Sequence, residues 1–331
     1  MILRLFSLLL ALSAFVTTLP ASAQNQTMKI VAFAGASNWP LWVGQDKGLF
    51  AAQRLEVGLD ITPNSIEMAK NLHQHRYDIA FSSVDNIIAY DEGQGEAALD
   101  GPAHFVALFG VDNGLLHVMA QPEITGFAAL KGQRVSVDAM TTGYSFVLRD
   151  VLKRKDIAFT DVEWIKVGGG AQRLDALLKK EQAATLLNTP LDLAAEARGL
   201  KRLLSVQDEL GAYQGIVAAT TRSQLADKQD LFLRFIKAFH QSIAWLADPA
   251  HHDEALGILM AHMPTMQRAA AEKAYRVLLD EKNGIYRDLK INRDGMKTVL
   301  RLRSTYGLPA KQLDNPELYI DETVLDKALR Q

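Results

Sequence analysis

The fold is indicated by one stretch, residues 37–50, which reads SNWPLWVGQDKGLF. Pro40 suits the first turn of a helix, where its missing N–H is not needed, and Gly48 suits the left-handed residue that ends one. Three apolar runs surround this predicted helix, at residues 30–33, 55–61 and 79–81. Each run leads into a polar loop that opens a helix. A repeated strand, loop and helix is typical of a parallel sheet covered by helices.

The loops that follow these strands predict a binding site. In parallel sheets, ligands lie beyond the carboxyl ends of the strands, where loops and helix N-termini converge. The loops here supply hydroxyls, amides, a carboxylate and one large ring that has no evident place in a core. We therefore expect ligand contacts from Ser37, Asn38, Trp39, Asn64, Ser82, Ser83 and Asp85. These residues include no evident nucleophile–base pair, so the pattern favours binding over catalysis.

A second strand–helix series predicts a second lobe. The apolar run at 134–137 leads through a loop into a helix whose apolar residues recur at i, i+3, i+4, i+7 and i+8 from Tyr144. The glycine-rich joints at 110–114 and 211–215 are interpreted as two crossings between lobes that act as hinges. Further ligand contacts are expected from Asp112, Thr141, Thr142, Tyr144, Ser145, Asn188 and Tyr213. The serines and threonines have a second interpretation, as ordinary N-caps of helices.

Residues 1–23 are predicted to be a cleaved signal peptide. Arg4 precedes an apolar run at 5–16, and the small residues at 21–23 offer a cleavage point. The run is too short to span a bilayer. The chain contains no cysteine, so it has neither disulfides nor the lipid-attachment residue of a bacterial lipoprotein. We therefore expect a protein that diffuses freely in the periplasm and is stabilised by its core.

Charge balance and motif spacing exclude several functions. The chain has 36 basic and 38 acidic side chains without a basic block, so nucleic acid is not an expected partner. Val147 stands where a nucleophile elbow beginning at Gly143 would need a second glycine. The glycines at 168–170 are not followed by the Lys-Ser or Lys-Thr pair of a phosphate loop. The histidines are not spaced as metal ligands, so no metal is expected. No cofactor and no catalytic residue are expected either.

Several segments together resemble a family. Residues 42–50, WVGQDKGLF, followed by LEV at 55–57, resemble the opening of solute-binding proteins of the sulfonate, nitrate and thiamine-precursor branch. Residues 77–80, YDIA, resemble the next step of that branch, a short acidic turn before a strand and a Ser/Thr loop. Later likenesses lie at residues 124–137, 190–199 and 319–321. One departure is QAA at 182–184, where the branch commonly has an acidic residue before alanine.

The resemblance implies a type II periplasmic-binding-protein fold. This is an α/β fold of two lobes, each a mixed β-sheet flanked by helices, with two hinge crossings. The first lobe would span 24–112 plus 217–331, and the second 113–216. The implied function is extracytoplasmic capture of a small molecule in the interlobe cleft, by a monomer that delivers it to the permease of an ABC importer. Two alternatives remain: an exported enzyme acting in the same cleft, and a ligand-presenting partner of a membrane sensor.

Overall fold

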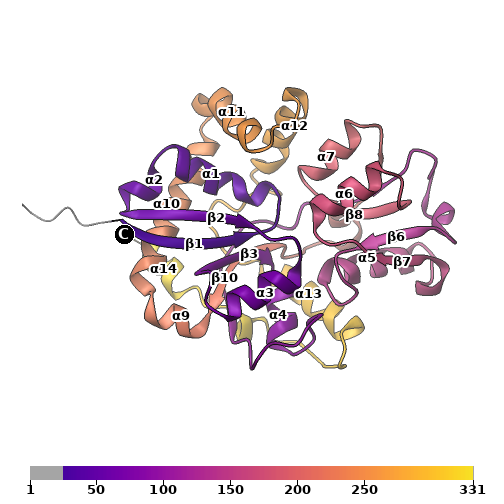
Figure 1. The fold of residues 1–331 in the computed structure, drawn as a ribbon, viewed down its shortest axis with the longest axis horizontal. Helices are drawn as coiled ribbons and strands as arrows, with labels where there is room; N and C mark the ends of the chain where they lie inside the picture. The colour runs from indigo at the N-terminus through magenta and orange to yellow at the C-terminus, as the bar shows by residue number, and fades with distance from the viewer. Residues whose placement is uncertain (1–24, 331) are drawn as a thin grey trace, which may run out of the picture.

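The computed structural model describes residues 25–330, so the predicted signal peptide at 1–23 lies outside the described residues. Two lobes lie side by side, and each is built on one five-stranded mixed sheet with helices packed against it (Figure 1). The predicted α/β architecture with a mixed sheet in each lobe is therefore confirmed. Every helix in the described part of the chain is too short or too polar to span a bilayer.

The sheet of the first lobe has the strand order β2-β1-β3-β10-β4. Strands β1 (Gln26–Ala32), β2 (Leu55–Ile61) and β3 (Ile79–Ser83) run parallel, as the repeated strand, loop and helix predict. Strand β10 (Ile216–Thr221) is antiparallel and lies between β3 and β4 (Phe105–Gly110). The helices of this lobe are α1 (Trp39–Asp46), α2 (Leu49–Ala52), α3 (Ser65–His73), α4 (Val84–Asp91), α9 (Arg222–Asp227), α10 (Gln229–Ala247), α11 (His252–His262), α12 (Arg268–Leu278), α13 (Arg293–Tyr306) and α14 (Thr323–Leu329).

The sheet of the second lobe repeats this arrangement in the order β7-β6-β8-β5-β9. Its parallel strands are β6 (Arg134–Val137), β7 (Glu163–Lys166) and β8 (Ala184–Asn188), and β5 (Leu116–Ala120) is antiparallel between β8 and β9 (Lys201–Ser205). The helices are α5 (Gly143–Arg154), α6 (Gly170–Leu178), α7 (Leu191–Glu196) and α8 (Val206–Leu210). Short 3-10 helices complete the two lobes: η1 (Ala36–Asn38), η2 (Phe127–Leu130), η3 (Phe159–Asp161), η4 (Pro249–His251) and η5 (Pro316–Tyr319).

Strand bounds show where sequence patterns succeed and fail. Strand β6 occupies the residues predicted for it, 134–137. Strand β10 begins at Ile216, so the residues before it belong to the crossing and not to the strand. Strand β9 is not predicted from the sequence. It is an edge strand that begins with two charged residues, Lys201 and Arg202, and it has no buried face that would give an alternating apolar pattern.

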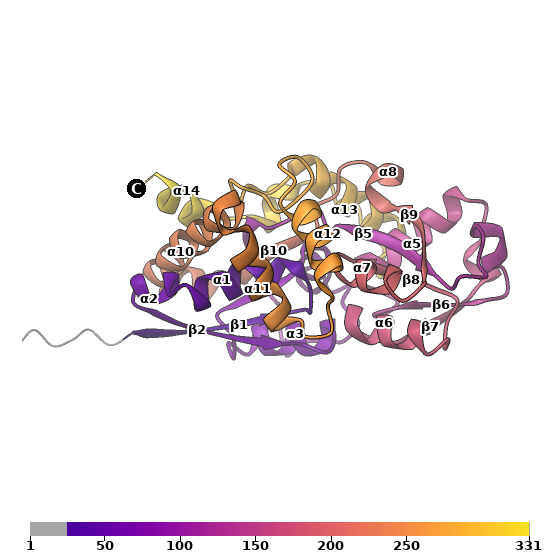
Figure 2. The same cartoon turned by 90° about the horizontal axis from the view of Figure 1, so that it is seen from above.

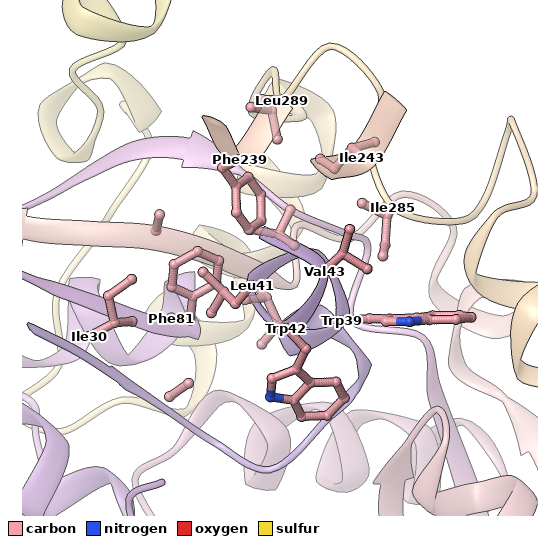
Figure 3. Packing of buried hydrophobic residues seen from close by; sticks show 14 of the residues in the cluster. Ile30, Trp39, Leu41, Trp42, Val43, Phe81, Phe239, Ile243, Ile285 and Leu289 are labelled. Carbon is pink, nitrogen blue, oxygen red and sulfur yellow. The ribbon is translucent and has the colours of Figure 1, made fainter. Parts of the chain in front are cut away.

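Aromatic rings fill the core of the first lobe. Phe81 of β3 and Phe109 of β4 contact Phe239 on α10, with ring centroids 5.3 and 5.4 Å apart. Figure 3 shows the side chains of α1 meeting this cluster from the neighbouring helix. Burying one such ring contributes about 1.5–3 kcal/mol, so this cluster is a major source of the lobe's stability.

The late helices of the first lobe also contact the second lobe. Helix α12 packs against α7, and α13 packs against α5 (Figure 2). The amide N–H of Asn292, just before α13, donates to Oε1 of Gln214 in the second crossing at 2.8 Å. The contacts of helix α13 therefore depend on how the two lobes are arranged.

The two crossings contact each other through glycine backbones. A Cβ added at Gly215 would overlap the backbone of Gly114, and Gly114 itself has a φ of +89°. Only glycine allows both the close approach and that backbone conformation. Between them lies Asp112, whose Oδ1 accepts hydrogen bonds from the N–H of Gly114 at 2.7 Å and of Ile216 at 3.2 Å. One buried carboxylate thus connects both crossings.

Asp112 is expected to make stability depend on pH. Burial raises the pKa of its carboxyl to about 6. The folded protein therefore binds this proton more tightly than the unfolded chain does, so the stability contributed by Asp112 is full below about pH 4 and is lost as the pH rises through about 6. Asp112→Asn keeps the acceptor oxygen and removes the titration. From pH 4 to 7, the unfolding free energy of the wild type should fall relative to this variant by about 1–3 kcal/mol.

Thermal and denaturant unfolding of both proteins across this range would measure the difference. Other carboxylates titrate in both proteins, and their effects cancel in the comparison. If the difference in unfolding free energy between the two proteins stays constant from pH 4 to 7, ionisation of Asp112 does not destabilise the folded protein.

Candidate functional site

A small cavity lies between the two lobes, beyond the carboxyl ends of the strands. It offers about 40 Å³ to the centres of water-sized molecules. The first lobe supplies Phe33, Ala34, Ser37, Phe81, Ser83, Asn86 and Ile216, and the second supplies Asp138, Thr142, Gly143, Tyr144, Gly169, Gly170, Arg173 and Asn188. Much of its wall is apolar carbon, and a few polar groups project from the strand ends and the first turns of α5 and α6. This is the composition typical of small-molecule sites.

Two polar atoms of the cavity residues are buried and have no hydrogen-bond partner. They are the hydroxyl oxygen of Tyr144 and Oδ1 of Asp138, whereas the buried Ser83 hydroxyl lies beside that of Tyr213. Burial raises the pKa of the Tyr144 hydroxyl well above its usual value, so it stays protonated and can donate. A buried polar group without a partner costs about 1–3 kcal/mol, so each atom would be stabilised by a ligand that pairs with it.

Arg173 brings a buried positive charge to the cavity. It lies in the first turn of α6 and is 3 % exposed. Its guanidinium donates to the carbonyl of Gly168 at 2.6 Å and twice to that of Leu186, at 3.0 and 3.3 Å. Burial lowers the pKa of Arg173, although a guanidinium stays charged throughout the physiological range. These backbone contacts fix the orientation of the guanidinium.

Several contacts hold the lobes together around the cavity. Arg303 of α13 binds Asp85 through two hydrogen bonds, at 2.8 and 2.6 Å, and donates a third across to the carbonyl of Thr141 at 2.8 Å. Glu96 of the first lobe accepts from the Thr141 hydroxyl at 2.9 Å and from Lys166 at 2.5 Å. These contacts join the two lobes beside the cavity and fix the N-terminus of α5 over it.

Among residues 25–330, no group of three or more histidine, aspartate or glutamate side chains is arranged to hold a metal ion. A sequence model of one family, described as NMT1/THI5 like, matches residues 36–252, which is more than half of the chain. The protein belongs to the NMT1/THI5-like family. No curated protein matches it by sequence.

Solved structures similar to this NMT1/THI5-like protein share its fold at low identity. The periplasmic nitrate-binding protein NrtA from Synechocystis PCC 6803 has a TM-score of 0.75 at 13% identity, covering 93% of this chain and 89% of its own. The ligand-binding component of an ABC-type import system from Staphylococcus aureus, solved with zinc, has 0.72 at 15%, covering 92% and 100%. The alkanesulfonate-binding protein SsuA from Xanthomonas axonopodis pv. citri, solved with MOPS, has 0.69 at 13%, covering 93% and 99%.

An enzyme shares the fold as well. The desulfurization enzyme DSZB has a TM-score of 0.63 at 13% identity, covering 92% of this chain and 99% of its own. The predicted type II periplasmic-binding-protein fold is thus confirmed for this NMT1/THI5-like protein. Because binding proteins and an enzyme both have it, the fold alone does not decide the function.

The structure brings part of the predicted binding set together. Ser37, Ser83, Thr142, Tyr144 and Asn188 all line the one cavity, although they come from both lobes. The Thr142 hydroxyl also donates to the carbonyl of Ala139 at 2.9 Å, which shapes the turn before α5. Whether these residues contact a ligand remains a prediction.

Other predicted residues lie outside the cavity lining and have local structural contacts instead. Asn64 caps α3, where its side chain accepts from the N–H of Glu67 at 2.9 Å. Asn38 donates to the carbonyl of Phe33 at 2.8 Å and so holds the loop before α1. Ser82 accepts from the side chain of Asn86 at 3.1 Å, one turn along the chain.

Trp39 is placed differently from the expectation that it faces the cleft. It is fully buried in the core of the first lobe, where its ring meets the edge of Tyr275 at 6.0 Å between centroids (Figure 3). The position before Pro40 suggested a loop, but Trp39 is the first residue of α1 and points into the space between α1 and α12. Helix α12 comes from far along the chain, so no local pattern reveals this contact.

The remaining acidic and hydroxyl candidates are also absent from the lining. Asp85 is paired with Arg303, and Asp112 with the crossing backbone, and neither lines the cavity. Thr141 binds Glu96 across the interlobe boundary. Ser145 is buried in α5 with an unpaired hydroxyl, and Tyr213 is buried beside Ser83 and lines a second hollow.

The sequence reading missed the charged groups of the cavity. The expected ligand contacts include no Lys or Arg, and residues 168–170 were compared only with a phosphate loop. Arg173 follows this glycine run by one helical turn and adds a positive charge to the cavity lining. Asp138, directly after β6, was readable as the first polar residue beyond a strand end.

Proposed function

We propose that this NMT1/THI5-like protein is an extracytoplasmic solute-binding protein that captures a small molecule between its lobes for an ABC importer. The supporting observation is the placement of the cavity, whose wall comes from both lobes at the carboxyl ends of their strands. A ligand in it contacts both lobes and therefore favours the closed arrangement. The names of the NrtA, SsuA and Staphylococcus aureus structures support the same role.

The partner in this proposal is the permease of an inner-membrane ABC importer, which binds the closed form. The proposed location is the periplasm, reached through the signal peptide predicted at 1–23 and without a lipid anchor. The proposed state is a monomer, with lobe boundaries near 112/113 and 216/217. The two crossings provide the hinge, and the contacts of Arg303 and Glu96 stabilise closure.

Native mass spectrometry of protein purified without refolding would test capture directly. We expect a co-purified small molecule that is released unchanged on denaturation and that protects the protein against thermal unfolding when added back. Cells lacking the protein should lose uptake of that molecule and regain it on complementation. Uptake that persists without the protein would contradict the importer role.

The enzyme alternative is kept because DSZB shares the fold. Incubating the identified molecule with excess protein separates the two functions. Quantitative recovery of the molecule supports capture, and conversion that scales with protein concentration supports catalysis. The sensor alternative predicts instead that the closed form binds a membrane receptor while uptake is unaffected.

A further inference from the structure

The unpaired groups of the cavity point to one chemical class of solute. We propose that the cavity binds a small zwitterion, with an acidic group against Arg173, a protonated amine against Asp138, and a short carbon skeleton against Phe33 and Phe81. The inference rests on the proposed function of solute capture. It adds to that function the charges that the solute must have.

Arg173 defines the acidic end. Three of its five N–H donors are used by the carbonyls of Gly168 and Leu186, which leaves one N–H on each terminal nitrogen. Two such donors, in one plane, match the two oxygens of a carboxylate, sulfonate or phosphonate. Gly169 and Gly170 expose the N-terminus of the nine-residue helix α6 beside it, which favours negative charge at the same point.

Asp138 defines the amine end. It follows β6, and its Oδ1 is buried without a hydrogen-bond partner. A carboxylate oxygen only accepts, so a ligand group that satisfies it must donate a proton. The nearby hydroxyl of Tyr144 is also unpaired, and it can complete the contacts of either end.

Arg173 and Asp138 act on each other's charge but form no direct ion pair, so each side chain can still contact an opposite charge on the solute. Within residues 25–330, no ion pair of 4.0 Å or less involves either side chain, although both line the same small cavity. A solute with an acid alone would leave Asp138 unpaired beside a second negative charge. A solute with an amine alone would leave Arg173 unpaired. Desolvating an unpaired charge is costly, so a molecule with both charges fits best.

The cavity also limits the size of the solute. The centres of water-sized molecules can reach about 40 Å³ of the cavity, so the space is small and suits a compact molecule. The apolar rings of Phe33 and Phe81 line the space between the polar ends. This favours a compact skeleton over a nucleotide or a peptide.

The test compares ligands that differ in one charge. Isothermal titration would measure glycine, β-alanine, γ-aminobutyrate and the corresponding aminosulfonates, each against the acid and the amine of equal length. The zwitterion of the best length should bind about 10- to 100-fold more tightly than either single-charged partner, as expected for one charged hydrogen-bonded contact. Equal affinity for a zwitterion and its amine-free acid would overturn the proposal.

Two variants test which side chain contacts which end of the solute. Asp138→Asn replaces the carboxylate by a neutral amide of the same shape, and the carboxylate makes no hydrogen bond that the fold needs. The variant should therefore fold normally and lose most of the preference for the zwitterion over the acid. Arg173→Met should weaken acid and zwitterion alike. Asp175→Asn is the matched control, because Asp175 lies on α6 with an exposed side chain paired to Lys179. An Asp138→Asn protein that still prefers the zwitterion would contradict the assignment even if Arg173→Met does not fold.

These outcomes are separable from those of the proposed function. A co-purified molecule that is released unchanged but has only one charge overturns the zwitterion class and leaves capture intact. A zwitterion that binds as predicted and is then consumed overturns capture and leaves the ligand class intact.

Discussion

An Arg303→Met variant is expected to lose about 3–5 kcal/mol of unfolding free energy and to melt about 5–8 °C below the wild type. Arg303 is fully buried and binds Asp85, which is 1 % exposed, through both carboxylate oxygens. Removing the guanidinium leaves a carboxylate in the protein interior without its counter-charge. The cost arises from this unpaired charge more than from the loss of the pair itself.

Two companion variants test that explanation. Asp85→Asn combined with Arg303→Met removes both charges and should recover much of the lost stability. Arg301→Met, on the same helix, removes a half-exposed arginine whose 3.5 Å contact with Asp150 is solvent-screened, and it should cost less than about 1 kcal/mol. If Arg303→Met melts like Arg301→Met, the buried pair does not stabilise the fold. The carbonyl contact to Thr141 predicts in addition a weaker closure of the lobes, seen as a larger radius of gyration in X-ray scattering.

Trp39→Ala is expected to destabilise the protein by about 3–5 kcal/mol while leaving ligand affinity nearly unchanged. The indole is fully buried between α1 and α12 and does not line the cavity. Truncation would leave a void among Trp39's core neighbours that only partial relaxation can fill. Thermal unfolding of the ligand-free protein measures the stability, and titration with the co-purified solute measures the affinity.

Trp39→Phe tests the contribution of the apolar ring separately from that of the indole N–H. The indole N–H is buried without an acceptor, so phenylalanine keeps most of the apolar contact and removes an unsatisfied donor. It should restore most of the stability lost in the alanine variant. A large loss of affinity in Trp39→Ala with unchanged melting would return Trp39 to the binding site, against its observed place in the core.

The contrast between Trp39 and β6 explains how far the sequence could predict the structure. Strand β6 depends on residues within a few positions, so local pattern was sufficient. The environment of Trp39 depends on Tyr275, which is remote in sequence. The same limit applies to Asp85, whose partner Arg303 lies at the other end of the chain.

The candidate site was predicted in its location and only partly in its chemistry. Hydroxyls and amides at strand ends, such as Ser83 and Asn188, were recognisable because the carboxyl edge of a sheet is a general binding position. Arg173 was not, since a helical arginine usually faces solvent, and only the packing of α6 directs it inward.

The strand order of the first sheet has a consequence for how the chain folds as it is made. Strand β10 lies between β3 and β4, so this sheet stays incomplete until residues 216–221 have been synthesised. All five strands of the other sheet fall within residues 116–205, an uninterrupted segment. The lobe that comes second in the sequence can therefore complete its sheet first.

At about 5–20 residues per second, the chain from β4 to β10 takes on the order of ten seconds to make. During that interval β3 and β4 each have an edge without a neighbour, which is an aggregation hazard. The second lobe is inserted in the sequence of the first, and this sets the order of assembly. The sheet of the second lobe can form early, and the sheet of the first lobe is complete only when β10 has been made.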